Sequence, residues 1–598
     1  MRRIFPLLAL LAALLAPRVP AQHLNWDLHE VAWVMRPAAD GETIDMEMTL
    51  NPLLDRDRVV VRIPLWRPGS YRYANYQDRI KDLHAVDQDG ERREILELDP
   101  RTWEVDAQGA TSLQIRYTLP VTNEADEGET PAIHLRSPMT FLYTEDTKLL
   151  SHTLRVELPS GWDFASGHRP DAHEKGLFRS PDYDVFVDCP IALGGLERHS
   201  FMSHGTEIEW VLFGRLPSEA EFSREEWTRK LKAISEVGYD IFGSYPFEKY
   251  TYLFLLNGIG GVSGLEHLNS TSILVNHRGV KNGSYIDPLE SVTAHEFFHL
   301  WNVKRIRPEQ LGPFDYTQDV RSTDLWWMEG ITSYYNDVML QRAGLREDGW
   351  FWASQSRNFL SVRRSPGFGT NSPERSSWTV WDPDPSKSIS YYDQGQMLGL
   401  LLDIKIRAHT ENRRSLDDVL AFLARWIDYP GPGYSQDELQ RAIYAVTGWD
   451  CEQFFDRHIE GLIDPPFAEI LPLAGLDVVW IEADDPYVGI GFADEDELEL
   501  AIREGTPAGE AGLQSGDRLL QIGGERVRDL DEVRAALDSA QAGDEIEVRV
   551  RRGGSTKDVT ITVAERGRLT FRISENPDAS PSQIAIREGL LTGTPESI

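Results

Sequence analysis

The chain contains 598 residues, with 61 Lys and Arg against 96 Asp and Glu, which gives a formal net charge of −35. A surface this acidic repels nucleic acid and anionic lipid, so we expect neither as a partner. The length exceeds what one hydrophobic core organises and predicts three or four domains. Cys189 and Cys451 are the only cysteines, too few for a disulfide-rich fold. They form either one disulfide bond or two buried free thiols.

Residues 1–21 have the features of a secretory signal peptide. Arg2 and Arg3 precede an apolar stretch over 4–15, and Val19-Pro20-Ala21 closes the segment. That stretch is too short to span a bilayer, and no later run is long enough. We therefore expect a periplasmic or secreted protein with no transmembrane segment in the mature chain. A retained hydrophobic anchor is the alternative.

Residues 22–195 are expected to form a β-rich domain. Short alternating runs, such as 59–63 and 113–117, are separated by Pro, Gly, Asp and Asn, which are strand and turn signals. A β-sandwich that walls one side of a cleft is the predicted result. Within it, Trp-Arg-Pro-Gly-Ser-Tyr over 66–71 predicts a structured turn whose role is structural.

The most informative motif is His-Glu-Phe-Phe-His over 295–299. On a helix, His295 and His299 project from one face and can bind one Zn²⁺, while Glu296 can accept a proton from bound water. Asp287, as N-cap, and Pro288, at the first helical position, predict where this helix starts. The alternative is a pair of satisfied core histidines.

A catalytic zinc site needs a third protein ligand, usually a carboxylate. The downstream candidates are Glu309, Asp315, Asp319, Asp324 and Glu329. We favour Glu329, because the segment 324–335 reads as part of a helix that ends near Gly344, and a helix aims a side chain with little freedom. Glu329 follows His299 by 30 residues, so 302–319 must loop out.

Four blocks of sequence, 66–71, 295–308, 327–335 and 391–396, resemble the glycyl aminopeptidase family, bacterial zinc peptidases that carry a PDZ domain. The longer spacing to Glu329 is that family's own pattern, and the resemblance covers nearly the whole mature chain. It implies an α+β multidomain protein. The domains would be an N-terminal β-sandwich (22–195), a thermolysin-like, mostly helical zinc peptidase domain (196–470) and a C-terminal PDZ domain (475–565).

The resemblance also implies how a substrate would be held. Residues 253–256 read as a buried strand, and a glycine-rich run that includes Gly261 follows it. Related aminopeptidases bind substrate backbone with a Gly-x-Met-Glu-Asn segment on an edge strand, and Gly264-Leu265-Glu266-His267 looks like its equivalent. Glu266 would then pair with the substrate α-ammonium. A plain edge-strand glutamate is the alternative.

Related enzymes stabilise the oxyanion with a tyrosine hydroxyl. Tyr392 is the first candidate and Tyr391 the second, because they precede a leucine-rich helix through Arg407. Tyr334 and Tyr335 are not excluded, and core packing is expected for at least two of the four.

The expected chemistry is hydrolysis by one Zn²⁺ per chain, held by His295, His299 and Glu329, with Glu296 as general base. The family resemblance implies an aminopeptidase that acts on peptide substrates with a small N-terminal residue, Gly or Ala. One alternative is an envelope endopeptidase whose PDZ domain captures substrates. Another is a noncatalytic PDZ adaptor.

Within the PDZ region, Gly489-Ile490-Gly491-Phe492 resembles a carboxylate-binding loop, and strands are expected over 545–550 and 558–563. The partners would be peptide C-termini that add a strand to the sheet edge. The alternative is a groove filled by the protein's own chain. Residues 566–598 are polar and predict a partly disordered tail.

Overall fold

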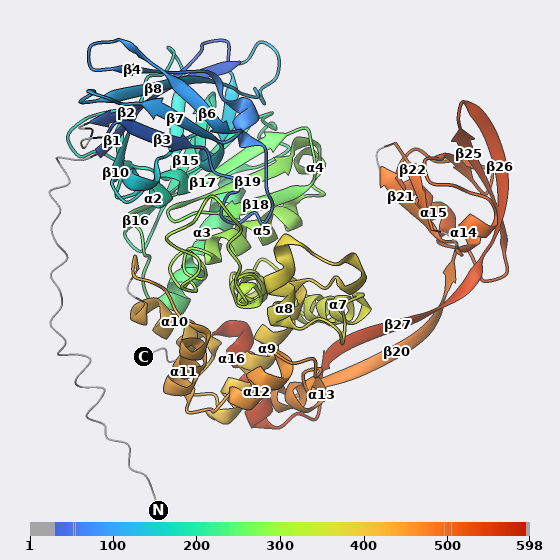
Figure 1. Ribbon diagram of the computed structural model, residues 1–598. Coiled ribbons are helices and arrows are strands. Elements are labelled where there is room, and N and C mark those ends of the chain that lie inside the picture. The colour runs from blue at the N-terminus through green and yellow to red at the C-terminus, as the bar shows by residue number, and fades with distance from the viewer. Residues whose placement is uncertain are drawn as a thin grey trace, which may run out of the picture. The chain divides into compact units, whose positions relative to one another are not determined.

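The computed structural model describes residues 30–593 except 52, 54, 55, 428, 495, 496 and 504, so the predicted signal peptide lies outside the described residues. Two compact units are present (Figure 1). Within the described residues, the first comprises 30–354, 361–475 and 578–593, and the second comprises 355–360 and 476–577. No described helix is both long enough and apolar enough to cross a bilayer.

The first unit begins with the expected β-rich domain. Its largest sheet has eight strands in the order β12-β13-β10-β1-β2-β8-β4-β5, and two three-stranded sheets have the orders β11-β14-β9 and β3-β7-β6. The bounds are β1 Glu30–Pro37, β2 Thr43–Asn51, β3 Arg58–Arg62, β4 Lys81–Asp87, β5 Arg92–Arg93, β6 Ile95–Asp99, β7 Thr102–Asp106, β8 Leu113–Pro120, β9 Ala132–Leu135, β10 Ser151–Val156, β11 Asp163–Ser166, β12 Arg169–Pro170, β13 Leu177–Ser180 and β14 Ile191–Gly194, with α2 Tyr183–Asp188.

The sheets enclose one core because their strands alternate between buried and solvent-facing residues. In β1, every second residue is buried, Trp33 among them. Apolar residues of β3, β7, β9 and β14 join those of β1, β2 and β8 in one cluster, which is the sandwich predicted from the alternating runs. Cys189 and Cys451 are both buried and unpaired, so the bridged alternative is wrong.

A five-stranded sheet in the order β15-β16-β17-β19-β18 opens the catalytic region. The strands are β15 Leu196–Ser203, β16 Thr206–Gly214, β17 Lys249–Asn257, β18 Val262–Glu266 and β19 Ser270–Asn276. β17 contains the predicted buried run 253–256. β18 lies at the edge and runs antiparallel to β19, and within the described part of the chain no strand pairs with its outer side.

Helices make up most of the remaining catalytic region (Figure 1). They are α3 Arg224–Phe242, α4 His277–Lys281, α5 Ile286–Phe298, α6 Thr332–Arg342, α7 Trp350–Arg364, α8 Pro373–Trp378, α9 Tyr391–His409, α10 Leu416–Trp426, α11 Gln436–Thr447, α12 Glu452–His458 and α13 Phe467–Ile470, and a π-helical turn, Trp326–Ile331, leads into α6. The predicted helix end near Gly344 agrees with α6, whose last residue is Arg342.

The start of α5 differs from the prediction. The helix begins at Ile286, so Asp287 is not the N-cap and Pro288 is not the first helical residue. Glu290, which fits a capping-box position by spacing, is instead buried and forms ion pairs with Lys230, at 2.8 Å, and with Arg346. A buried carboxylate gains more from two cations than from one backbone N–H, and the pairs join α5 to α3 through Lys230 and to the segment after α6 through Arg346.

The second unit contains the PDZ domain. Its main sheet has the order β21-β22-β23-β25-β26, with β24 paired to β23, and β20 and β27 form a separate two-stranded ribbon. The bounds are β20 Leu476–Tyr487, β21 Ile490–Asp494, β22 Glu499–Ile502, β23 Arg518–Ile522, β24 Glu525–Arg526, β25 Glu545–Arg552, β26 Ser555–Thr562, β27 Ala564–Glu575, α14 Pro507–Glu510 and α15 Leu530–Leu537. The two predicted strands correspond to β25 and β26.

The predicted carboxylate loop leads into β21, the edge strand of this sheet. Gly489 has φ +75° just before the strand, and Ile490, Gly491 and Phe492 begin it. Among the described residues, β21 pairs only with β22, so its other side offers backbone groups to an added strand.

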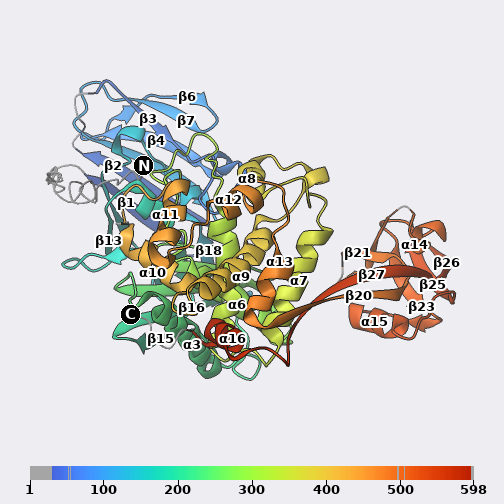
Figure 2. The same cartoon turned by 90° about the horizontal axis from the view of Figure 1, so that it is seen from below.

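The predicted disordered tail is wrong for the part of 566–598 that the structure describes. β27 continues to Glu575, and α16, Pro581–Thr592, packs against α6 and α9 of the first unit (Figure 2). A capping box between Ser580 and Gln583 starts this helix, and its side chains Ile586 and Leu590 are buried.

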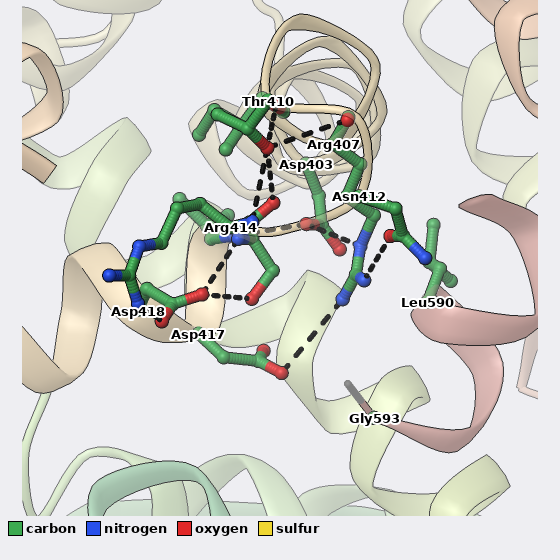
Figure 3. Close-up of polar contacts among 12 residues, drawn as sticks. Asp403, Arg407, Thr410, Asn412, Arg414, Asp417, Asp418, Leu590 and Gly593 are labelled. Carbon is green, nitrogen blue, oxygen red and sulfur yellow. Dashed lines mark hydrogen bonds and ion pairs between the residues drawn. The ribbon is translucent and has the colours of Figure 1, made fainter. Parts of the chain in front are cut away.

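A buried arginine helps to hold α16 in place (Figure 3). Arg407, fully buried in α9, donates to Asp403 at 3.0 Å and to the side-chain oxygen of Asn412 at 3.1 Å. Asn412 in turn donates to the carbonyl of Ala585 in α16, at 2.9 Å. Charged and polar groups thus link the C-terminal helix to the centre of the helical region.

We expect Arg407→Met to lower the free energy of unfolding by about 3 kcal/mol, because it leaves the buried Asp403 carboxylate without its cation. Arg441→Met is the matched control, since Arg441 and Asp437 form a pair of the same i,i+4 spacing that is exposed. Its effect should stay below about 0.5 kcal/mol. Urea unfolding followed by tryptophan fluorescence measures both variants, and equal losses would contradict the assigned role of Arg407.

Candidate active site

The two histidines of the motif meet at the C-terminal end of α5. Their Nε2 atoms lie 3.0 Å apart, with the ring planes at 85°. His299 is buried, and its Nδ1 lies 2.7 Å from the carbonyl oxygen of Asn302. A carbonyl accepts only from a protonated Nδ1, so this contact leaves the Nε2 lone pair of His299 free for a metal.

Glu329 points at both imidazoles from the π-helical turn. Its Oε2 lies 3.3 Å from His295 Nε2 and 3.1 Å from His299 Nε2. Four-coordinate zinc with bonds of about 2.0–2.1 Å places neighbouring ligand atoms about 3.3 Å apart, so the three atoms fit one ion. Of the five acidic candidates in the sequence, this is the one that the fold brings to the histidines.

Asn302 explains how a glutamate 30 residues away is aimed so closely. Its side-chain amide donates to the carbonyl of Trp327 at 3.0 Å and to Thr332 Oγ1 at 3.1 Å. Its carbonyl accepts from His299, so one residue connects the end of α5 to both sides of Glu329. The segment after Asn302 contains turns but no helix or strand up to the π-helical turn, which agrees with the predicted loop.

The electrostatics of the three groups favour a cation. Burial lowers the pKa of His299, but the Glu329 carboxylate outweighs it and raises that pKa to about 10. Burial and the neighbouring His299 lower the pKa of His295. Burial acts to raise the pKa of Glu329, yet the two imidazoles hold it well below its usual range. The trio therefore stabilises positive charge between its members, where a divalent ion fits.

Glu296 lies on the same turn of α5, behind the edge strand β18. It is buried, its Oε2 has no hydrogen-bond partner among the described residues, and burial raises its pKa well above the usual range. The strand can approach because residue 264 is glycine: a Cβ there would lie 2.3 Å from Glu296 Oε1. A carboxylate with one unsatisfied oxygen can accept a proton from water.

The predicted substrate segment is divided between a strand and a loop. Glu266 ends β18, and one of its oxygens, one oxygen of Glu296 and one nitrogen of His299 lie within 4.8 Å of one another. Gly264 is inside the strand. Gly261 precedes it, with open space around its Cβ position.

The turn over 66–71 was expected to have only a structural role, but its residues line the site directly. Gly69 adopts φ +76°, and a Cβ there would lie 2.4 Å from Leu265 Cδ1 and 3.1 Å from Glu266 Oε1. Trp66, Tyr71, Glu266 and Glu329 line one cavity of about 60 Å³ with this turn. The N-terminal domain thus walls the site, as the sandwich prediction required.

Tyr392 and Tyr391, at the start of α9, lie beside the metal-ligand candidates. The Tyr392 ring stacks on His295 with centroids 6.0 Å apart, and the two tyrosine rings are 4.8 Å apart. By contrast, the hydroxyls of Tyr334 and Tyr335 donate to Asp403 and Asp417 in the helical core, so packing accounts for both.

Tyr71 is a site residue that sequence reasoning missed. Burial, followed by the charge of Glu329, raises its pKa well above the usual range. The available signal was that Tyr71 lies in the block 66–71, which resembles the family and for which no chemical role was expected.

Two glycines place α9 against the π-helical turn. A Cβ on Gly330 would lie 2.3 Å from Gly395 Cα, and a Cβ on Gly395 would lie 1.9 Å from the carbonyl oxygen of Trp326. The backbones therefore touch, which brings Tyr391 and Tyr392 close to Glu329.

Three family models and one solved structure are similar to large parts of this chain. The family profile described as M61 glycyl aminopeptidase matches residues 289–398, the Peptidase M61 N-terminal domain matches 34–195, and a PDZ domain matches 486–563. The crystal structure of an aminopeptidase N family protein from Idiomarina loihiensis superimposes with a TM-score of 0.77 at 22% identity, covering 94% of this chain and 100% of that one. At that identity it supports the fold alone.

Three Staphylococcus aureus proteins, from strains N315, MSSA476 and MW2, are each 37% identical to this chain over 68 residues. Each is named "Putative zinc metalloprotease", and the match covers 11% of this chain and 16% of the relative. The chain therefore spans a small part of their length.

The fold and the arrangement of the site are typical of zinc metallopeptidases, and the chain also contains an N-terminal β domain and a PDZ domain. Its N-terminal and catalytic segments match the models of the M61 glycyl aminopeptidase family over residues 34–195 and 289–398.

We expect Gly264→Ala to lower kcat/KM by about a hundredfold, because the added methyl displaces Glu296 by roughly 1 Å or more. Gly261→Ala is the matched control from the same glycine-rich segment, since its added methyl meets open space. Peptide hydrolysis and zinc content, measured side by side, check both variants. Full activity of Gly264→Ala would show that the strand does not pack on Glu296 as described.

Proposed function

We propose that this chain is a zinc aminopeptidase that removes small N-terminal residues, Gly or Ala, from peptides. The observation that carries the proposal is the position of Glu266, whose carboxylate lies within 4.8 Å of the Glu296 and His299 atoms. A carboxylate so near the reacting centre leaves space for one residue between the bound α-ammonium and the scissile bond. That spacing favours removal of a single residue over internal cleavage.

The preference for a small residue is supported by the cavity beside Glu266. The turn over 66–71 lies close to this end of β18, because a Cβ on Gly69 would lie 2.4 Å from Leu265 Cδ1 and 3.1 Å from Glu266 Oε1, which leaves little room for a side chain there. Glycine or alanine fits such a space, whereas a larger side chain would have to displace the turn over 66–71.

The residues divide the proposed reaction between them. His295, His299 and Glu329 would hold one zinc ion per chain, which when bound supplies an acidified water and polarises the scissile carbonyl. Glu296 takes the proton of the attacking water and returns it to the departing amine. Tyr392 donates a hydrogen bond to the carbonyl oxygen as negative charge develops on it, with Tyr391 as the second candidate.

The PDZ domain would bind peptide C-termini. Gly489, Ile490, Gly491 and Phe492 would present backbone N–H groups to a terminal carboxylate, while the peptide pairs with the open side of β21.

Acetylation of the substrate tests the aminopeptidase proposal. We expect kcat/KM for an alanyl peptide to fall about a hundredfold or more on N-acetylation, because the charge pair with Glu266 is lost in a partly dry site. Glu266→Gln should cause a similar loss with the free peptide while zinc content stays unchanged. Equal cleavage of free and acetylated peptides would favour the endopeptidase alternative.

Conservative tyrosine variants test the oxyanion donor. Tyr392→Phe should lower kcat about a hundredfold with little change in KM, because the lost hydroxyl acts on the transition state. Tyr391→Phe and Tyr71→Phe are the controls, expected to change kcat by less than about fivefold. A large loss in Tyr391→Phe alone would transfer the role to Tyr391.

A further inference from the structure

Three arginines surround a cavity of about 250 Å³ next to the edge strand β18. They are Arg67, from the turn over 66–71, Arg72, which follows that turn, and Arg136, which follows β9. Ser263 and Leu265 of β18 line the same cavity. Two segments of the N-terminal domain thus bring three guanidinium groups to the strand that the proposed function assigns to substrate.

These arginines lack acidic partners. Among the described residues, no carboxylate oxygen lies within 4.0 Å of the side-chain nitrogens of Arg67, Arg72 or Arg136. The chain has a net charge of −35, yet within its described part these three neighbouring guanidinium groups have no carboxylate at ion-pair distance.

The two aspartates in the wall of the cavity are already engaged elsewhere. Asp188 pairs with Lys304 at 2.6 Å and accepts from the backbone N–H of Leu268 at 2.6 Å. Asp184 accepts from the Tyr316 hydroxyl at 2.8 Å. Asp188 is therefore neutralised by Lys304, and Asp184 alone offsets part of the charge of three arginines, so the lining keeps a net positive charge.

The charges act on one another. Burial first, and then the charges of Arg136 and Arg72, lower the pKa of Arg67 to about 10. Burial likewise lowers the pKa of Arg136, to which Arg72 adds. A bound anion would relieve this repulsion, and planar guanidinium groups are well suited to a carboxylate.

The alternation of β18 directs part of a bound peptide to this cavity. A Cβ on Gly264 would point at Glu296, and the Glu266 carboxylate lies near the Glu296 carboxylate, so the alternate positions Ser263 and Leu265 point to the other face, where they line the cavity with the arginines. A peptide paired with the open edge alternates in the same way, so its second side chain points opposite to its first. In the antiparallel direction, with the amine at Glu266, the peptide continues toward Ser263 and Arg136.

We propose that Arg67, Arg72 and Arg136 form a carboxylate subsite on the leaving-group side of the scissile bond, which makes acidic or very short peptides the preferred substrates. The proposal rests on the aminopeptidase function proposed above. The carboxylate has two possible sources, the side chain of Asp or Glu at the second position and the C-terminal carboxylate of a dipeptide or tripeptide.

Matched peptides separate the two sources. Gly-Glu-Ala-amide against Gly-Gln-Ala-amide tests the side chain, and Gly-Ala as free acid against its amide tests the terminus. We expect the full-length zinc enzyme to prefer the carboxylate member of at least one pair by about tenfold in kcat/KM, and the preference to shrink in high salt.

Variants then assign the preference to the arginines. Arg72→Gln and Arg136→Gln should each reduce it to about twofold or less, while kcat/KM for the neutral peptide changes little. Arg136→Lys should restore part of it. Arg92→Gln, an exposed arginine in β5 of the same domain, is the control and should leave the preference intact.

Binding to metal-loaded Glu296→Gln, measured by calorimetry with the same peptide pairs, is independent of turnover. If neutral peptides are hydrolysed but neither carboxylate is preferred in rate or binding, the subsite is refuted and the aminopeptidase function stands. If carboxylate peptides bind more tightly through Arg136 but no peptide is hydrolysed, the subsite stands and the proposed reaction fails. A preference that persists in both Gln variants would also refute the subsite.

Discussion

The site depends on holding one buried carboxylate, that of Glu329, against two imidazoles. Burying a charged carboxylate costs free energy. Fixing a side chain that comes from a flexible loop adds a cost in conformational entropy. Asn302 solves this by bonding to His299 with its carbonyl and to the backbone around Glu329 with its amide. The long separation in sequence between Asn302 and Glu329 is therefore short in space.

The two other acids of the site differ because their surroundings differ. Glu296 is buried under β18 with one oxygen unsatisfied, which suits a group that exchanges a proton. Glu266 ends the strand and faces a cavity that a substrate can enter. Glycine at 264 sets the distance between them, since any larger side chain would separate strand from helix. The absence of a side chain at position 264 is therefore a requirement for this arrangement of Glu296 and Glu266.

Sequence patterns are most informative where geometry is local. The spacing of His295 and His299 fixes their common face on any helix, and a helical segment around Glu329 was enough to select it from five acids. Such patterns fail where contacts are distant: neither Asn302 nor Tyr71 carries a periodic signal that would connect it to the site. In the C-terminal segment, the capping box of Ser580 and Gln583 could have indicated the start of α16. The polar composition of the segment led instead to a prediction of disorder, although α16 buries a short apolar face.

Charge gives the edge strand a direction. The negative group that would hold an amine, Glu266, lies at the C-terminal end of β18, and the arginines lie along its other face toward Ser263. A bound peptide has a positive amine at its start and a negative carboxylate further along. Only one antiparallel register would place the amine at Glu266 and the carboxylate at the arginines. Backbone pairing alone tolerates slippage by two residues, because every second position is equivalent. Fixed charges at both ends remove that freedom, and they do so most effectively for a peptide short enough to bring its own carboxylate to Arg136.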